Sequence, residues 1–181
     1  MGWHMQPTRQ VVFSDCRIPV ENRLSDEGDG FGIAMSGLDG GRLNIAACSL
    51  GGAQWALERA TAYVKERYAF GEPLAAQQSI VFTIADMETQ LQAARALLER
   101  AAGLMDSGAA GAAAACALAK RFATAAAFDV ANSALQLHGG YGYLQEYGIE
   151  RVVRDLRVHQ ILEGTNEIMR LIVGRSVLGA R

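Results

Sequence analysis

The sequence is poor in cysteine and in long apolar runs, and each shortage excludes a class of protein. Its three cysteines, Cys16, Cys48 and Cys116, are far apart and form no CxxC pair, so neither a disulfide framework nor a zinc site is expected. No stretch of about 18 apolar residues is free of charges or glycines, which argues against a membrane-spanning helix. The first ten residues, MGWHMQPTRQ, lack the apolar core of a signal peptide. These absences are typical of a soluble intracellular protein.

The sequence also has no large excess of positive or negative charge. The chain has 17 Lys and Arg residues against 19 Asp and Glu residues, a formal net charge of −2, and its only lysines are Lys65 and Lys120. Because no basic surface is indicated, neither nucleic acid nor an anionic membrane is an expected partner. Hydrophobic residues make up 50% of the 181 residues, which is enough for the core of one domain.

Helical periodicity dominates the rest of the chain. Over about residues 74–107, apolar residues recur at spacings of three and four, which predicts a long amphipathic helix. Two further long helices are expected over about residues 31–68 and 112–137, and shorter ones over about 145–160 and 166–178. The apolar positions of the most regular helix are Ile80, Ile84, Met87, Leu91, Ala94, Leu98, Ala101 and Met105.

Residues 10–24 are different, because they contain β-branched residues and a proline but no helical period. This pattern predicts one or two short strands. Gly28, Gly30 and Gly32 then mark the change to helix. The expected fold class is therefore all-α, an up-down four-helix-type bundle with a short N-terminal β remnant.

The segment LEGTNEIMR at residues 162–170 contains the most informative carboxylate. Glu163 stands directly before a Gly-Thr-Asn turn and a new helix, which Thr165 or Asn166 can cap. Glu167 adds the negative charge that a helix N-terminus favours. Two interpretations fit the segment: a capping turn with a solvated glutamate, or a general base that points into a cleft ahead of the helix.

Two more features are ambiguous when considered alone. Arg67 at a helix end either complements the helix dipole or clamps a phosphate through its planar guanidinium. The run GGYGY at residues 139–143 resembles a dinucleotide-binding glycine loop, but no strand precedes it, so a Rossmann interpretation fails. Beside Gln136, its backbone amides could still contact the phosphates of a ligand.

A metal site is a weaker alternative. Asp155, His159 and Glu163 fall at i, i+4 and i+8, a spacing that could place three ligands on one helical face. Gly164, however, ends the helix at the third position, and no ExxH pair occurs elsewhere for a bundle metal site. No metal is expected.

Taken in order, seven segments resemble the acyl-CoA dehydrogenase family and extend from about residue 11 to residue 175. They are VVFSDCRIPVENRL, GLDGGR, RYAFGEPL, FTIADM, ALQLHGGYGY, ERVVRDLRVHQI and LEGTNEIMRLIVGR. The wording GWHMQPTR, GGRLNIA and HQILEGTNE is most similar to the isobutyryl-CoA dehydrogenase branch. The resemblance implies an FAD-dependent enzyme that oxidises a short, branched acyl-CoA to the 2,3-enoyl-CoA. It also implies an electron-transferring flavoprotein as the electron acceptor.

The resemblance further assigns roles to single residues. Glu163 matches the base that removes the α-proton while the β-hydride passes to flavin. Some relatives carry their base at the position of Gly41, where this chain has no side chain. The substrate-binding positions are Asp39, Arg42 and Gly164. The positions expected to reach the FAD of a neighbouring subunit are Arg67, Phe70, Gln78, Gln136, Gly139 and Gly140, and those expected to touch FAD in the same subunit are Thr165 and Glu167.

The resemblance also implies a domain boundary. Residues 1–27 are expected to be the end of a central β-domain whose earlier part holds the flavin ring, and residues 28–181 the C-terminal helical bundle domain. A homo-oligomer, dimer or tetramer, is expected in the bacterial cytoplasm or the mitochondrial matrix. One alternative from another class stays open: a non-catalytic helical assembly module that pairs with a partner subunit.

Overall fold

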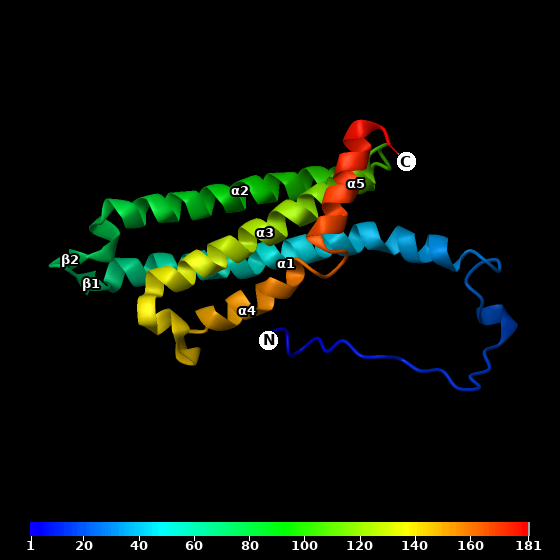
Figure 1. Ribbon diagram of the computed structural model, residues 1–181, viewed down its shortest axis with the longest axis horizontal. Coiled ribbons are helices and arrows are strands. Elements are labelled where there is room, and N and C mark those ends of the chain that lie inside the picture. Colours follow the sequence, from blue (N-terminus) through cyan, green and yellow to red (C-terminus); the bar gives the residue numbers. More distant parts are fainter. Residues whose placement is uncertain (181) are drawn as a thin grey trace.

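The computed structural model describes residues 1–180, and helices dominate it (Figure 1). The expected all-α bundle is confirmed. The helices are α1 (Gly30–Glu66), α2 (Gln78–Asp106), α3 (Ala112–His138), α4 (Ile149–His159) and α5 (Asn166–Leu178). Short 3-10 helices occupy Val20–Asn22, Leu74–Ala76, Gly139–Tyr143 and Gln145–Tyr147. None of the helices within residues 1–180 is long and apolar enough to cross a membrane.

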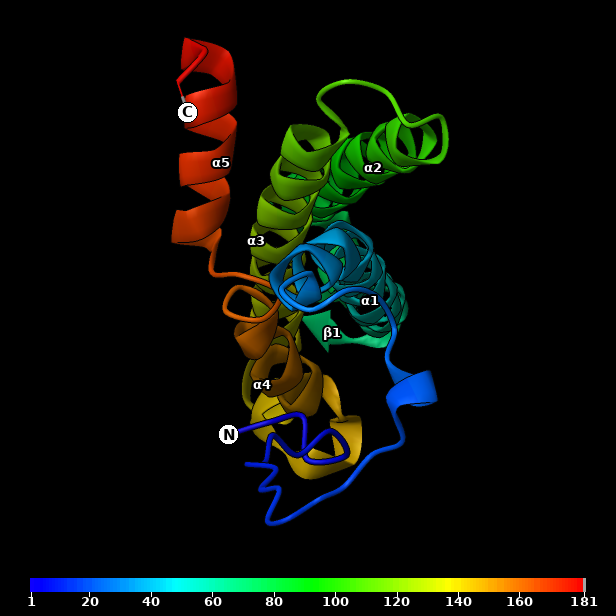
Figure 2. The same cartoon turned by 90° about the vertical axis from the view of Figure 1, so that its right-hand side faces the viewer.

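Helices α1, α2 and α3 form the body of the bundle, and α2 runs in the opposite direction to α1 and α3 (Figure 1). The end view shows α4 and α5 on the α3 side of this body (Figure 2). Because α1 and α3 run in the same direction, their first turns lie near one end of the bundle and their last turns at the other. A small antiparallel hairpin, β1 (Tyr68–Ala69) with β2 (Glu72–Pro73), closes that second end.

The core depends on small residues of α3. Ala123, Ala127 and Ala131 are fully buried there and pack against leucines of α1 and α2, such as Leu57 and Leu91. Alanine at a contact lets two helix axes approach closely. The alanine-rich sequence is therefore the packing surface of the central helix.

Most of the periodic residues expected to form the buried face of α2 do so. Met87, Leu91, Ala94 and Ala101 are buried, and Ile80, Ile84 and Leu98 pack against the core. Met105 was wrongly included, since its side chain is exposed. In the last turn of α2 it is Leu104 that packs against a second cluster around Leu43 and Cys116.

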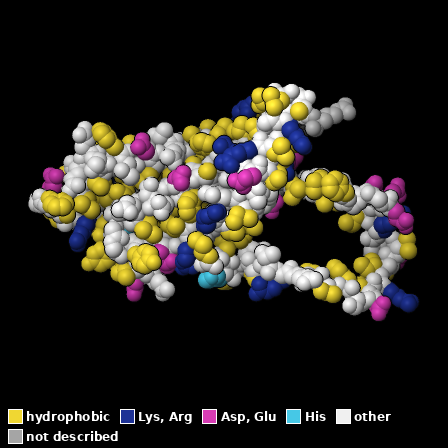
Figure 3. Space-filling view, in the orientation of Figure 1, with side chains coloured by type: hydrophobic (Ala, Val, Ile, Leu, Met, Phe, Trp, Pro, Cys, Tyr) yellow, Lys and Arg dark blue, Asp and Glu magenta, His cyan; other side chains and the backbone are white. Residues whose placement is uncertain are grey.

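The strands expected at residues 10–24 do not form, and that prediction is wrong. The segment is extended coil except for the 3-10 turn Val20–Asn22. A strand is stabilised by a hydrogen-bonded neighbour, and within residues 1–180 no other strand lies beside this segment. Figure 3 shows it arching away from the bundle. Its apolar side chains, Val11, Val12, Phe13 and Ile18, are exposed. The domain boundary after residue 27 stays a prediction.

Candidate active site

Glu163 lies on the junction between α4 and α5, in an unusual backbone conformation. Its φ is 54°, and Gly164 after it has a φ of 87°. The left-handed region costs a residue with a side chain about 1 kcal/mol or more. The turn is closed by a hydrogen bond from the Asn166 amide to the Gln160 carbonyl at 2.9 Å. The fold therefore holds this glutamate in one strained, defined geometry.

The carboxyl group of Glu163 occupies the space beside Gly41 of α1. A Cβ atom added to Gly41 would come within 2.8 Å of Glu163 Cδ, closer than real Cβ contacts. Any side chain at position 41 would therefore displace the carboxyl group. The two residues are far apart in the sequence, so their contact is a product of the α1–α3 packing and the α4–α5 turn.

Helix α3 supports the junction from the other side. Lys120, which is fully buried, donates from Nζ to the Gly164 carbonyl at 2.7 Å and to Asn166 Oδ1 at 3.0 Å. Burial lowers the pKa of Lys120 to about 8, although the negative charges of Glu163 and Glu167 act in the opposite direction. A buried ammonium group thus lies beneath the turn that presents Glu163.

The Asn166 side chain completes this network. It contacts Thr124 Oγ1 at 3.1 Å through Nδ2, and the Thr124 hydroxyl lies 3.2 Å from its Oδ1. From the sequence alone, Asn166 was expected only as a possible cap, and Lys120 had no expected role. A signal for Lys120 was present, because it is one of two lysines and stands inside an alanine-rich helix.

The expected cap of α5 is confirmed as Thr165, not Asn166. Its hydroxyl accepts from the Ile168 amide at 3.4 Å. Glu167 is exposed and pairs with Arg170 at 3.1 Å. Hydrogen bonding to its own backbone amide, with smaller contributions from Thr165 and Arg170, lowers the pKa of Glu167. Both residues expected to touch FAD in the same subunit therefore lie within four residues of Glu163.

Asp39 and Arg42 flank Gly41 on α1. They form an ion pair with 2.5 Å between Asp39 Oδ1 and Arg42 Nη1. Arg42 is buried, and its Nε has no hydrogen-bond partner among residues 1–180. Its positive charge also acts on Lys120. Gly164 thus directly follows Glu163, and Arg42, paired with Asp39, directly follows the Gly41 that the Glu163 carboxyl group approaches.

A second candidate site is a groove of about 760 Å³ at the hairpin end of the bundle. Arg67, Gln136, Gly139 and Gly140 all line it. Aromatic rings surround them: the Arg67 guanidinium carbon lies 5.7 Å from the centre of the Tyr141 ring. Tyr63 and His138, which also line the groove, stack with ring centres 4.4 Å apart.

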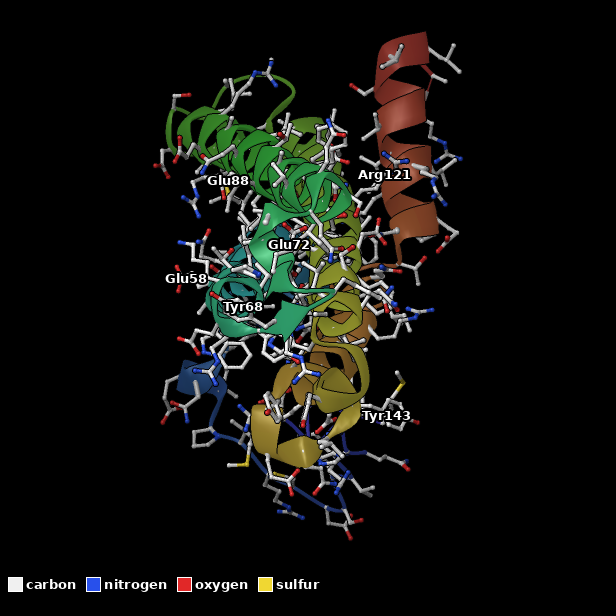
Figure 4. The ribbon with its side chains drawn as sticks, turned by 90° about the vertical axis from the view of Figure 1, so that its left-hand side faces the viewer. Glu58, Tyr68, Glu72, Glu88, Arg121 and Tyr143 are labelled. Carbon is white, nitrogen blue, oxygen red and sulfur yellow. The ribbon has the colours of Figure 1, made fainter. Side chains whose placement is uncertain are left out.

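Two expected members of this set lie outside the groove lining. Phe70 is 95% exposed at the turn of the hairpin, and Gln78 is exposed at the first residue of α2. Figure 4 looks at this end of the molecule, with Tyr68 and Glu72 of the hairpin in the foreground. Phe70 and Gln78 thus lie at the same end of the bundle as the groove but do not line it.

The two sites are separated along α3. Lys120 marks the Glu163 end and His138 the groove end, and the helix rises about 27 Å over the 18 steps from one to the other. Arg67 and the Gly139-Gly140 pair are close enough to contact one ligand, but Glu163 is not in that groove.

The alternative metal site is not supported. The His159 ring is buried and its Nδ1 lies 2.8 Å from the Ser49 hydroxyl, while Asp155 accepts the Trp3 amide through Oδ1. Burial lowers the pKa of His159 to about 4. Within the described part of the chain, no group of three His, Cys, Asp or Glu side chains could hold a metal ion.

Comparison with known proteins gives one consistent result. Residues 28–178 match the model of the acyl-CoA dehydrogenase C-terminal domain. The chain is 51% identical over 178 residues to mitochondrial isobutyryl-CoA dehydrogenase of Bos taurus, a match covering 98% of this chain and 43% of that protein. Butyryl-CoA dehydrogenase from Megasphaera elsdenii superposes with a TM-score of 0.89 at 46% identity, over 92% of this chain and 43% of that one.

A chain from the structure of the electron transferring flavoprotein of Acidaminococcus fermentans superposes equally well. Its TM-score is 0.89 at 46% identity, and the match covers 92% of this chain and 44% of that one. The present chain spans less than half the length of these relatives. It belongs to the acyl-CoA dehydrogenase family of FAD-dependent oxidoreductases, and it matches the C-terminal domain of that family.

Proposed function

We propose that this chain is the C-terminal domain of an FAD-dependent enzyme that oxidises a short, branched acyl-CoA to the 2,3-enoyl-CoA, with Glu163 as its catalytic base. The observation that carries the proposal is the position of Glu163. Its carboxyl group is held beside Gly41 by a strained turn, and two expected substrate-binding residues, Gly164 and Arg42, are the chain neighbours of Glu163 and Gly41. The 51% identity to an isobutyryl-CoA dehydrogenase supports a short, branched acyl group.

The chemistry assigned to Glu163 is removal of the α-proton of the thioester. A general base must be ionised and held within hydrogen-bond reach of that proton. The left-handed turn fixes the direction of the side chain, and a fixed direction reduces the entropic part of the barrier. By the family resemblance, the Glu163 amide donates to the thioester carbonyl, which makes the α-proton more acidic. Bound FAD supplies the acceptor for the β-hydride.

The groove at the other end of the bundle fits the diphosphate and aromatic parts of FAD. Arg67 offers a planar pair of donors for phosphate oxygens, and the glycine pair offers backbone amides without side chains in front of them. The rings of Tyr63 and Tyr141 offer apolar surface for stacking. The donor set therefore matches the expected cofactor.

The separation of the two sites supports an assembly of subunits. Since about 27 Å of α3 lies between them, one active site takes Glu163 from one subunit and the groove from its neighbour. A homo-oligomer, dimer or tetramer, meets this requirement. The similarity to a chain in the Acidaminococcus fermentans structure supports an electron-transferring flavoprotein as the partner that accepts the electrons.

The test is Glu163→Gln in the FAD-loaded enzyme that contains this chain. Glutamine keeps the size and polarity of the side chain but cannot act as the base, so isobutyryl-CoA oxidation should fall by about 10²–10⁴-fold. The matched control is Glu99→Gln, which alters an exposed carboxylate on α2 and should leave turnover unchanged. Near-normal turnover of Glu163→Gln would reject Glu163 as the base, and a lack of acyl-CoA oxidation by the unmodified FAD-loaded enzyme would favour the non-catalytic assembly module.

A further inference from the structure

Lys120 is a buried cation that the proposed chemistry leaves without a role. Its side chain is fully buried, and both of its hydrogen-bond acceptors are neutral. Among residues 1–180, no carboxylate oxygen lies within 4.0 Å of its ammonium group. Burying a charge without a contact partner is unfavourable for folding. The apolar, alanine-rich core around α3 could accept an apolar residue here at lower cost, so the presence of lysine requires another explanation.

Both acceptors of Lys120 belong to the turn that presents Glu163. The Gly164 carbonyl directly follows the glutamate, and Asn166 is the first residue of α5. Hydrogen bonds from an ammonium group are about twice as strong as those between neutral groups. Lys120 therefore connects α3 to the residues on either side of Thr165, Gly164 and Asn166. Gly164 and the residue before it, Glu163, are the two residues of this turn with a positive φ.

The charges around Lys120 fit the same explanation. The nearby negative charges that favour its protonated form are those of Glu163, on the turn, and Glu167, on α5, and Arg42 of α1 opposes them. The Glu163 carboxylate consequently favours the charged form of Lys120 without contact. A neutral apolar residue at position 120 would remove both this attraction and the two hydrogen bonds to Gly164 and Asn166.

We propose that Lys120 is a positioning residue for the base: through the Gly164 carbonyl and the Asn166 side chain, it fixes the left-handed turn that keeps the Glu163 carboxylate beside Gly41. The inference rests on the proposed role of Glu163. Lys120 itself does not touch the carboxylate, so its effect is on the placement of the base and not on acyl-CoA binding.

The experiment is Lys120→Met in the FAD-loaded enzyme. Methionine has a similar length but no donors, so the turn is released. Because a displacement of about 1 Å can cost about 10²-fold in rate, kcat should fall by about that factor, while KM for isobutyryl-CoA stays within about threefold. The control is Val130→Ala, a fully buried position of the same helix away from the junction. It should lower the unfolding midpoint but leave kcat within about twofold.

A second variant and a structural readout keep the inference testable if Lys120→Met does not fold. Asn166→Ala removes one of the two acceptors and should lower kcat by about tenfold. In a crystal structure of either variant, Glu163 should leave its left-handed conformation. Wild-type kcat, an unchanged Glu163 turn, or an equal loss in Val130→Ala would overturn the inference. Glu163→Gln in parallel tests the base itself, so an inactive Glu163→Gln beside a fully active Lys120→Met rejects only the role of Lys120.

Discussion

Replacing Gly41 with alanine separates the geometry of the site from the stability of the fold. The added Cβ would come within 2.8 Å of Glu163 Cδ and 3.3 Å of Oε1, and closer still to Oε2. Carbon atoms in ordinary contact are about 3.5–4.0 Å apart, so the carboxyl group must retreat by about 1 Å. A displacement of that size in a reacting group costs about 10²-fold in rate. We therefore expect Gly41→Ala to lower kcat by about two orders of magnitude.

The same substitution should not destabilise the helix. The Glu163 carboxyl group is the end of a flexible side chain and can move, while alanine within a helix is favoured over glycine by about 0.8–1 kcal/mol. Gly40→Ala is the matched control, because a Cβ at Gly40 would meet nothing within 4 Å. Both variants should show an equal or higher unfolding midpoint, and only Gly41→Ala should lose turnover in the FAD-loaded enzyme. Turnover of Gly41→Ala within twofold of Gly40→Ala would refute the reasoning.

Two further predictions concern other parts of the chain. The pKa of His159 is lowered from 6.5 to about 4, chiefly by burial, so the unfolded state binds the proton more readily between these values. The contribution of His159 to the free energy of unfolding should therefore be constant well above pH 6.5 and fall by up to about 2 kcal/mol as the pH drops to 4. Denaturant unfolding should show this loss, and His159→Gln, which cannot titrate, should lack it. In the FAD-loaded enzyme, Arg67→Ala should weaken FAD retention on gel filtration by about tenfold or more, and Arg67→Lys should restore it only in part because lysine lacks the planar donor pair. Undiminished retention in Arg67→Ala would place the phosphate contact elsewhere.

The helices were predictable because their signals are local. The expected helix over residues 112–137 is observed as Ala112–His138, since alanine favours helix and the glycines after it stop the helix. The expected strands at residues 10–24 failed for the opposite reason. A strand depends on a neighbouring strand, and nothing in the local sequence shows whether that neighbour lies beside it.

The same distinction applies to the candidate site. The turn after Glu163 was predictable from Gly164 and Thr165, because both signals lie next to it in the sequence. The close approach of Gly41 and the hydrogen bond from Lys120 were not predictable, because α1 and α3 are distant in sequence from the turn that they contact. Even the cap was decided by distant packing: Thr165 caps α5 because Asn166 is turned towards α3.

Helices α1 and α3 connect the two candidate sites mechanically. Each helix carries residues of both sites: α1 has Gly41 in its first half and Arg67 at its end, and α3 has Lys120 in its first half and Gly139 just beyond its end. The two helices run in the same direction and pack along their length (Figure 1). Because α3 contacts α1 through alanines, small changes in side-chain size along this interface would shift the residues at both ends of the two helices. On the proposed assignment, the packing between these two helices therefore sets the distance between the base of one active site and the cofactor groove of the next.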